Sequence, residues 1–231
     1  MNAVPIWVAL LFVATTLATL ATLACAHPDR TRIVAVGLVW MAAQTVVASR
    51  GFYHVTDTLP PRFLLLIAPA MLTVVLLMTT SRGRAWMRLM RPERLTLLHT
   101  VRVPVELTLW LLAGYGAIPT LMTFEGRNWD ILAGLTAPIV YYLYFKRQTL
   151  SRRSFVLWNV VSLATLANIV GHAILSAPSP FQKLAFDRPN IAIQYVPYVW
   201  LPSLVVPVVL FAHLASLSIT RRTDQANLHA E

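Results

Sequence analysis

Charged residues and cysteine are scarce in this sequence. Asp, Glu, Lys and Arg together make up 12% of its 231 residues, about half the share expected of a soluble domain. Hydrophobic residues make up 57%, which excludes a disordered chain, because disorder requires low hydrophobicity together with high charge. The single cysteine, Cys25, excludes a disulfide scaffold and a cysteine-rich zinc or iron–sulfur site. Glycine-rich nucleotide-binding motifs and the G-x-S-x-G motif of hydrolases are also absent.

Long apolar stretches dominate what is present. A helix that crosses a bilayer needs roughly 20 mostly apolar residues, and seven stretches approach or meet this length. We therefore predict an all-α fold, a seven-helix membrane bundle that forms a single domain over residues 1–231. The predicted spans are residues 4–26, 33–54, 63–80, 97–118, 131–145, 155–176 and 199–219, of which the fifth is short and the fourth contains charged residues.

Basic residues predict the orientation of this bundle, because Lys and Arg accumulate in cytoplasmic loops. The connections after the first, third, fifth and seventh spans hold two, five, four and two of them, whereas the opposite side holds five in total. This bias predicts an outside N-terminus, a cytoplasmic C-terminus and multi-pass insertion into a cell inner (plasma) membrane. We therefore assign the net charge of +10 to the membrane surface and not to nucleic acid. The expected partners are the lipid bilayer and a small-molecule ligand.

The first apolar stretch has a second interpretation as a signal peptide. Ala24-Cys25-Ala26 has the small residues that signal peptidase prefers. Two features oppose cleavage: no positive charge precedes the stretch, and cleavage would place most basic residues on the wrong side of the membrane. We therefore expect an uncleaved first span.

The basic connection between the third and fourth spans has a helical pattern of its own. Arg84, Arg88 and Arg91 recur at helical spacing with apolar residues between them. Such a segment favours the membrane surface, where cationic side chains meet anionic lipid. We predict an interfacial amphipathic piece within residues 81–96.

Charged residues inside the fourth span are the strongest functional signal. An ionisable group at membrane depth costs about 2.5–3.5 kcal/mol on insertion scales, so it usually faces a cavity or a partner. His99, Arg102 and Glu106 fall on one helical face, and Arg102 and Glu106 are spaced to form an ion pair. Pro104 frees the carbonyl of Thr100, so a kink is expected there. These residues predict either a ligand site or a structural ion pair between helices.

A second group of polar residues lies near the expected outer ends of the spans. Two imidazoles and a carboxylate would suit catalytic zinc, and His54, Glu125, Asp130 and His172 are the candidate ligands, although their spacing matches no zinc motif. The alternative is a solvated turn flanked by histidines that hydrogen-bond at helix ends. The whole group consists of Arg50, His54, Glu125, Arg127, Asn128, Asp130, Asn168 and His172.

The histidines also fall into two depth-matched pairs. His54 and His172 lie near the outer ends of the second and sixth spans, and His99 and His213 lie nearer the inner ends of the fourth and seventh. Facing imidazoles at matched depth in a helical bundle can hold haem. A b-type haem protein is therefore one of the alternatives.

The second and sixth spans hint at an internal repeat. Trp40 precedes His54 by 14 residues, and Trp158 precedes His172 by the same interval. Together with a fourth span that inverts the direction, this suggests a 3+1+3 arrangement, the topology of sugar-exporter-like transporters. The prolines do not fall at equivalent places in the two halves, so the pattern stays a hypothesis.

These features predict binding or translocation of a small polar or anionic solute through a pocket open to the outside. In this hypothesis Arg102 counters the charge of the solute, Glu106 balances Arg102 or takes a proton, and the outer polar group forms the entrance. The first alternative is a membrane-embedded enzyme with a periplasm-facing histidine–carboxylate site, with or without zinc, that acts on a lipid-linked or periplasmic substrate. The second is a bis-histidine haem electron carrier. The sequence leaves the direction of transport and the oligomeric state open.

Overall fold

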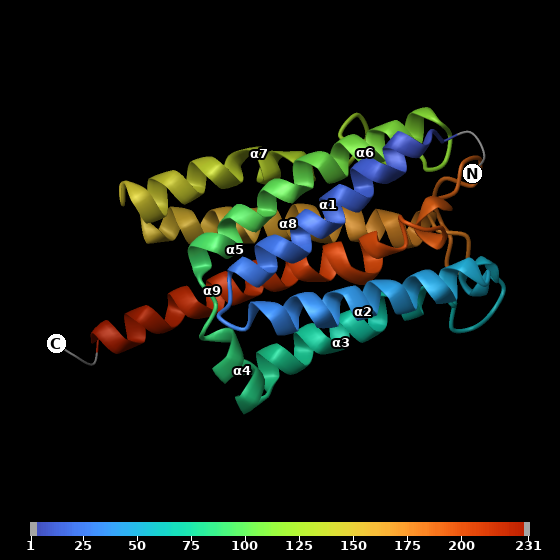
Figure 1. Ribbon diagram of the computed structural model, residues 1–231. Helices are drawn as coiled ribbons and strands as arrows, with labels where there is room; N and C mark the ends of the chain where they lie inside the picture. The colour runs from blue at the N-terminus through green and yellow to red at the C-terminus, as the bar shows by residue number, and fades with distance from the viewer. Residues whose placement is uncertain (1–3, 229–231) are drawn as a thin grey trace.

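The computed structural model describes residues 4–228, with side chains described as far as residue 220. Regular structure in this part of the chain is entirely helical, which confirms the all-α prediction. The long helices run roughly side by side along one direction, and the N- and C-terminal ends lie at opposite ends of the bundle (Figure 1). The α-helices are α1 (Ile6–Cys25), α2 (Arg30–Ser49), α3 (Leu64–Thr79), α4 (Ser81–Met87), α5 (Pro92–Leu98), α6 (Arg102–Gly114), α7 (Asp130–Tyr141), α8 (Arg152–Ser176) and α9 (Val206–Leu228).

Five helical segments are long and apolar enough to cross a membrane. A sixth is counted if α3 and α4 form one span, although they are bent by 89°. The fifth predicted span, residues 131–145, corresponds to α7, whose 12 residues continue into a five-residue π-helix, Tyr142–Lys146. This segment falls short of the roughly 20 residues that a span usually takes. The five segments are Ile6–Cys25, Arg30–Ser49, Pro92–Gly114, Arg152–Ser176 and Leu201–Thr220.

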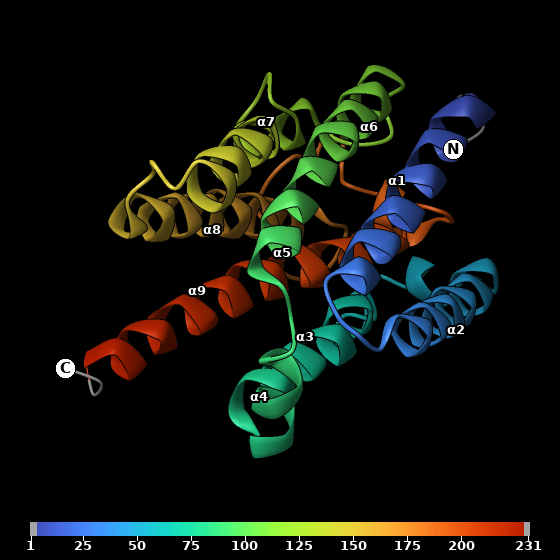
Figure 2. The same ribbon diagram turned by 60° about the vertical axis from the view of Figure 1, so that its left-hand side comes forward.

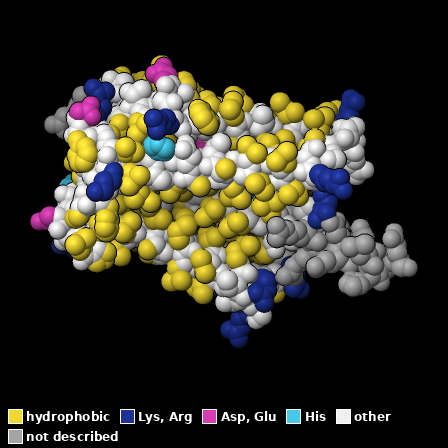
Figure 3. Space-filling model, turned by 180° about the vertical axis from the view of Figure 1, so that it is seen from behind, with side chains coloured by type: hydrophobic (Ala, Val, Ile, Leu, Met, Phe, Trp, Pro, Cys, Tyr) yellow, Lys and Arg dark blue, Asp and Glu magenta, His cyan; other side chains and the backbone are white. Residues whose placement is uncertain are grey.

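The surface of the bundle fits an apolar surrounding. Hydrophobic side chains cover the middle of the face in Figure 3, whereas Lys and Arg gather toward its two ends. Large apolar side chains point outward on several helices, including Val39 on α2 (71% exposed) and Leu132 on α7 (59% exposed). Soluble proteins rarely expose contiguous apolar patches of this extent. The outward apolar face of α7 bears on whether this helix crosses a membrane, because α7 is shorter than the other candidate spans.

The basic connection after α3 is helical only in part. At Thr80 the backbone is extended, and the Thr80 side chain accepts a hydrogen bond from the Gly83 amide at 3.0 Å, which starts α4 at a sharp angle. A Cβ at Gly83 would lie 2.5 Å from the Leu77 Cα, so glycine permits this close return of the chain. Of the amphipathic piece predicted within residues 81–96, the first helix, α4, ends at Met87. Arg91 lies beyond it and donates its backbone amide to the Ala26 carbonyl at 2.8 Å.

The predicted fourth span begins five residues earlier than expected and is interrupted. Pro92 occupies the first turn of α5, where its missing N–H costs nothing. A 3-10 turn, His99–Val101, separates α5 from α6. This turn contains the carbonyl that Pro104 frees, in agreement with the predicted irregularity. The helix ends near Gly114, and Gly116 has a φ of 74° that few other residues adopt.

The interrupted helix α5–α6 occupies a central position. It packs against α1 on one side and α7 on the other, and α5 also contacts α9. Figure 2 shows α5 and α6 running between α1 and α7. The buried face of this helix carries His99, Arg102 and Glu106, so the charged residues of the predicted fourth span lie in the interior.

Candidate functional site

The Arg102 guanidinium forms an ion pair with the Asp130 carboxylate. The Nη2 and Oδ2 atoms lie 3.4 Å apart, and both side chains are buried. The same Nη2 donates a hydrogen bond to the Ser162 carbonyl at 3.2 Å, so Arg102 joins the starts of α6 and α7 to the middle of α8. The predicted pairing of Arg102 with Glu106 is therefore wrong. Spacing along one helix permits that pair, but the facing helix offers a carboxylate that the sequence spacing does not reveal.

A glycine on α7 allows this ion pair to form. Gly134 lies one turn after Asp130, and a Cβ there would meet the Val103 backbone nitrogen at 3.0 Å and the Arg102 Cβ at 3.1 Å. Helices approach each other closely where small residues lie at their contact. The close approach of α7 to α6 thus brings Asp130 within reach of Arg102.

Glu106 bonds to Asn128, which lies just before α7. Asn128 Nδ2 donates to Glu106 Oε1 at 2.5 Å and to the Met122 carbonyl at 3.1 Å. Asn128 Oδ1 accepts from the Asp130 amide at 3.1 Å, a local Asx-type contact that favours a helix start. Asn128 has no exposed surface. One amide side chain therefore holds Glu106 and orients the first residue of α7. In the sequence, Asn128 stands in the polar stretch before the fifth predicted span, and its position there does not reveal this role.

A cavity of about 80 Å³ borders these residues. Its polar lining comes from Glu106, Asn128, Asp130 and Asn190, and the rest is apolar side chains from Phe63 and α3, α6, Met122, α8 and the chain around residues 190–206. The Glu106 Oε2 and Asn190 Nδ2 atoms are buried and have no hydrogen-bond partner among the described residues. An unmet buried polar atom costs about 1–3 kcal/mol. The volume is several times the ~10–15 Å³ that one water requires, so a small solute or water fits here.

His99 and His213 form a buried pair beside this cluster. Their ring centroids lie 3.7 Å apart with an interplanar angle of 17°, and Trp158 flanks both rings. Asn159 donates through Nδ2 to the Phe155 carbonyl, so its Oδ1 faces His213 Nδ1 at 2.9 Å and accepts from it. The stacked rings leave no space for a macrocycle between them. Of the two depth-matched pairs predicted from the sequence, His99 and His213 are therefore in contact with each other and cannot sandwich a haem.

The outer polar residues are held in separate local contacts. The His54 ring packs on the Tyr195 ring, with ring centroids 4.4 Å apart. Glu125 Oε1 accepts a hydrogen bond from Trp110 Nε1 at 2.9 Å. Asn168 Nδ2 donates to the Arg127 carbonyl at 2.8 Å, whereas the Arg127 side chain is exposed. These contacts place the residues on loops and helix ends and do not gather their side chains into one site.

The four candidate zinc ligands do not converge. His172 Nδ1 lies 2.8 Å from the Asn168 carbonyl on its own helix, and Asp130 is engaged by Arg102. Within residues 4–220, whose side chains are described, no group of three or more His, Cys, Asp or Glu is arranged to hold a metal ion. The predicted metal set is therefore not assembled, because its members sit on separate elements and make separate contacts.

The end of the second predicted span also differs. α2 ends at Ser49, and Gly51 has a left-handed φ of 72°. Arg50 is exposed beyond the helix, and His54 belongs to a short 3-10 turn, whereas His172 lies inside α8. The two Trp–His pairs of the suggested repeat thus occupy unequal positions.

A buried phenol lies just before the last long apolar helix, Leu201–Thr220. Tyr198 packs against Phe12 on α1, with ring centroids 5.4 Å apart. Burial raises the pKa of Tyr198 to about 12, because a phenolate is poorly solvated there. Tyr198 is therefore neutral at physiological pH and contributes packing area at this end of the bundle.

Comparison with known proteins assigns the chain to a family. No curated protein and no solved structure matches it. Residues 59–221 match a family described as domain of unknown function DUF8737. The matched segment contains the Arg102–Asp130 and Glu106–Asn128 contacts and both stacked histidines. Because the match covers more than half of the sequence, the chain belongs to the DUF8737 family.

Proposed function

We propose that this protein is a multi-pass membrane protein whose buried site binds and translocates a small solute that donates hydrogen bonds. In this proposal seven segments cross a cell inner membrane, with the N-terminus outside and the C-terminus in the cytoplasm. The five long apolar helices and the one-sided distribution of basic residues support it.

The short α7 fits this topology with its π-helical extension. Asp130–Lys146 rises about 25 Å at 1.5 Å per residue, close to the ~30 Å hydrocarbon thickness. Lys146 at its end can extend its ammonium toward the headgroups, and a short span can be accommodated by local thinning of the bilayer. Pro69 lies inside α3. A proline is tolerated in a spanning helix, so it does not exclude α3 from crossing the membrane.

The lining of the cavity indicates the class of solute. Arg102 does not line it, because its guanidinium is directed to Asp130 and Ser162. The sequence-based idea that Arg102 counters an anionic solute is therefore replaced. Glu106 Oε2 offers a free acceptor and Asn190 Nδ2 a free donor. A small cation such as ammonium, or a neutral amide such as urea, satisfies the acceptor.

One observation carries the proposal. Glu106 is buried and lines the cavity, its Oε1 accepts one hydrogen bond, and its Oε2 has no hydrogen-bond partner among the described residues. Among the described residues, the carboxylate in ion-pair contact with Arg102 is that of Asp130 and not that of Glu106. Arg102, His99 and His213 continue the buried polar groups from Glu106 toward the other end of the bundle, where a translocation pathway has to lead.

Uptake by reconstituted protein tests this proposal. Proteoliposomes are supplied with radiolabelled methylammonium or with radiolabelled urea, and initial rates are compared with protein-free vesicles. We expect protein-dependent uptake of at least one probe. Glu106→Gln removes the charge but keeps the size, and we expect uptake to fall about tenfold, in line with the loss of one hydrogen bond to a charged group.

Glu125→Gln is the matched control, because Glu125 is exposed in the outer loop and lies outside the cavity. Its uptake should equal that of the unaltered protein. Equal uptake by the Glu106 and Glu125 variants would contradict the assignment of Glu106. No uptake of either probe above empty vesicles would overturn translocation of this solute class.

A further inference from the structure

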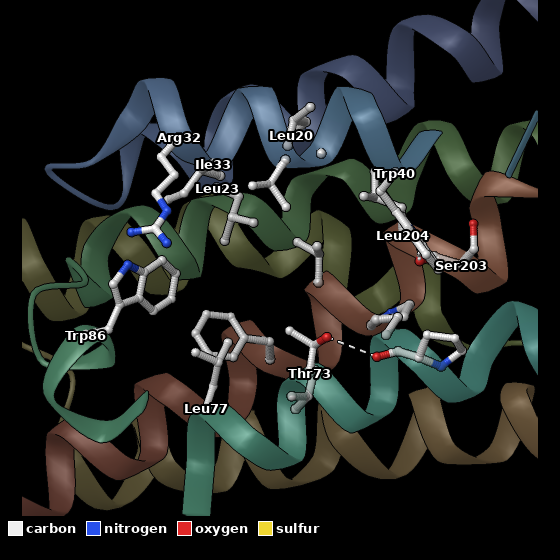
Figure 4. A pocket seen from close by; sticks show the side chains of 18 of the residues that line it. Leu20, Leu23, Arg32, Ile33, Trp40, Thr73, Leu77, Trp86, Ser203 and Leu204 are labelled. Carbon is white, nitrogen blue, oxygen red and sulfur yellow. Dashed lines mark hydrogen bonds between the residues drawn. The ribbon is translucent and has the colours of Figure 1, made fainter. Parts of the chain in front are cut away.

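A second and larger cavity lies on the other side of the bundle. It has a volume of about 530 Å³ and is lined by residues of α1, α2, α3, α4, the π-helix Leu201–Val205 and the start of α9. Leu20, Leu23, Ile33, Leu77 and Leu204 project into it from different elements (Figure 4). Small-molecule sites commonly measure about 300–1,000 Å³. We call this cavity the α1–α3 groove.

The polar atoms along the groove bind each other. Trp40 Nε1 donates to the Ser203 carbonyl at 2.8 Å, and the Ser203 hydroxyl donates to the Val199 carbonyl at 2.9 Å. The Thr73 hydroxyl donates to the Pro69 carbonyl at 2.9 Å, the contact drawn in Figure 4. These groups need no partner from a ligand. The long part of the groove therefore offers carbon surface, which suits a hydrocarbon chain.

One end of the groove is charged. Asp29 and Arg32 line it there beside Trp86, and Figure 4 shows the Arg32 guanidinium directed toward the Trp86 ring, away from the Trp40 end. Within the described side chains, neither Asp29 nor Arg32 takes part in an ion pair. The turn between α1 and α2 places this end where the chain reverses direction, at the level expected for lipid headgroups.

We propose that the α1–α3 groove binds one phosphatidylethanolamine molecule of the leaflet at the α1–α2 turn. An acyl chain occupies the apolar length, the phosphate accepts hydrogen bonds from Arg32, and the ammonium of the headgroup donates to Asp29. This occupant matches both unpaired charges. A purely anionic headgroup would leave Asp29 beside a phosphate, and a detergent-like neutral amphiphile would leave both charges unpaired.

Native mass spectrometry of the purified protein tests the headgroup. The protein is mixed with equal amounts of phosphatidylethanolamine and phosphatidylglycerol of identical chains. We expect one retained phosphatidylethanolamine per chain. Arg32→Gln should lower this retention roughly tenfold through loss of a charge-assisted contact, whereas Asp29→Asn should shift the preference toward phosphatidylglycerol. Arg30→Gln is the control, because Arg30 is exposed on the same helix and does not line the groove.

A pair of tryptophan variants tests the groove itself. Val36 lines it and Val39 does not, although both are exposed on α2. Val36→Trp should displace the lipid, and Val39→Trp should retain it, with size-exclusion profiles showing that both variants fold. Equal lipid retention in these two variants would overturn the location. Equal retention of the two lipids by the unaltered protein would overturn the headgroup assignment, and retention of neither would overturn the site.

Discussion

The Asn128 amide donates a 2.5 Å hydrogen bond to Glu106, and its oxygen receives the backbone amide of Asp130. The Asn128 side chain therefore positions both acids of the site: Glu106, and Asp130 as the first residue of α7. This contact is buried and joins a loop to the interior of α6. Its consequences, and those of the neighbouring contacts, can be measured.

Asn128→Ala should destabilise the protein by about 2–4 kcal/mol, because it leaves Glu106 Oε1 and the Asp130 amide without partners. Thermal unfolding in detergent, followed by tryptophan fluorescence, measures the change. Asn168→Ala is the control, since Asn168 bonds to the Arg127 carbonyl near the surface. If both variants unfolded at one temperature, the buried role of Asn128 would be disproved.

The Arg102–Asp130 pair should behave as a coupled unit. Arg102→Met leaves the buried Asp130 carboxylate without its cationic partner, and Asp130→Leu leaves the buried Arg102 guanidinium without this carboxylate. Each single change should therefore lower the free energy of unfolding by about 3–5 kcal/mol. The double variant removes both charges and should recover much of that loss. Unfolding free energies of the four proteins complete the cycle. Additive losses would show that the two groups do not interact.

Gly134→Leu should separate α7 from α6 and weaken the same ion pair, because even a Cβ at this position would lie within 3.0 Å of the Val103 backbone nitrogen. We expect loss of folded protein or a large drop in thermal stability. At Gly114 an added Cβ meets nothing within 4 Å, so Gly114→Ala should have little effect. Comparable effects at both glycines would refute the close approach.

The stacked histidines should differ in their contribution. His213→Phe removes the donor to Asn159 Oδ1 and should cost about 1–3 kcal/mol. His99→Phe keeps the ring stacking, and His99 makes no side-chain hydrogen bond with the described residues, so its cost should be smaller. Thermal unfolding of the two variants ranks them. A larger loss for His99→Phe would argue that His99 has a partner this arrangement does not include.

The crossing of α7 can be tested with single cysteines in a Cys25→Ala background, because the free Cys25 is exposed and has to be removed as a second labelling site. In intact cells, a membrane-impermeant maleimide should label Arg127→Cys before α7 but not Gln148→Cys after it. Permeabilised cells should show labelling at both positions. Labelling of both positions in intact cells would mean that α7 does not cross the membrane, and it would contradict the seven-span topology.

Much of the site was predictable because charge in an apolar run is conspicuous. His99, Arg102, Glu106 and Asp130 were all named from the sequence, and all are buried in the structure. Their partners were not predictable, since spacing along one helix suggested Glu106 for Arg102, and the facing helix supplied Asp130. Asn128 gave only a weak signal, an Asx residue two positions before a helix start.

The sequence also concealed the larger groove. Arg32 was counted among the residues that set the orientation, and nothing in its surroundings along the chain distinguishes it from Arg30. Only the packing of α1 and α2 against α3 and α9 places Arg32 and Asp29 at the end of an apolar cavity. Conversely, the outer residues that were grouped by their depth do not form one site, because Glu125, Asn168 and His172 each bond to a different partner.

By itself, the sequence determined that the chain is helical and apolar outside, because long runs of hydrophobic residues can satisfy their backbone hydrogen bonds in lipid only as helices. It also determined which charges are costly enough to require partners. Only the tertiary structure decided which residues these partners are and where the cavities lie. Contacts such as Arg102 with Asp130 depend on the distance between two helices, and that distance follows from packing at Gly134, which no periodicity along the chain records.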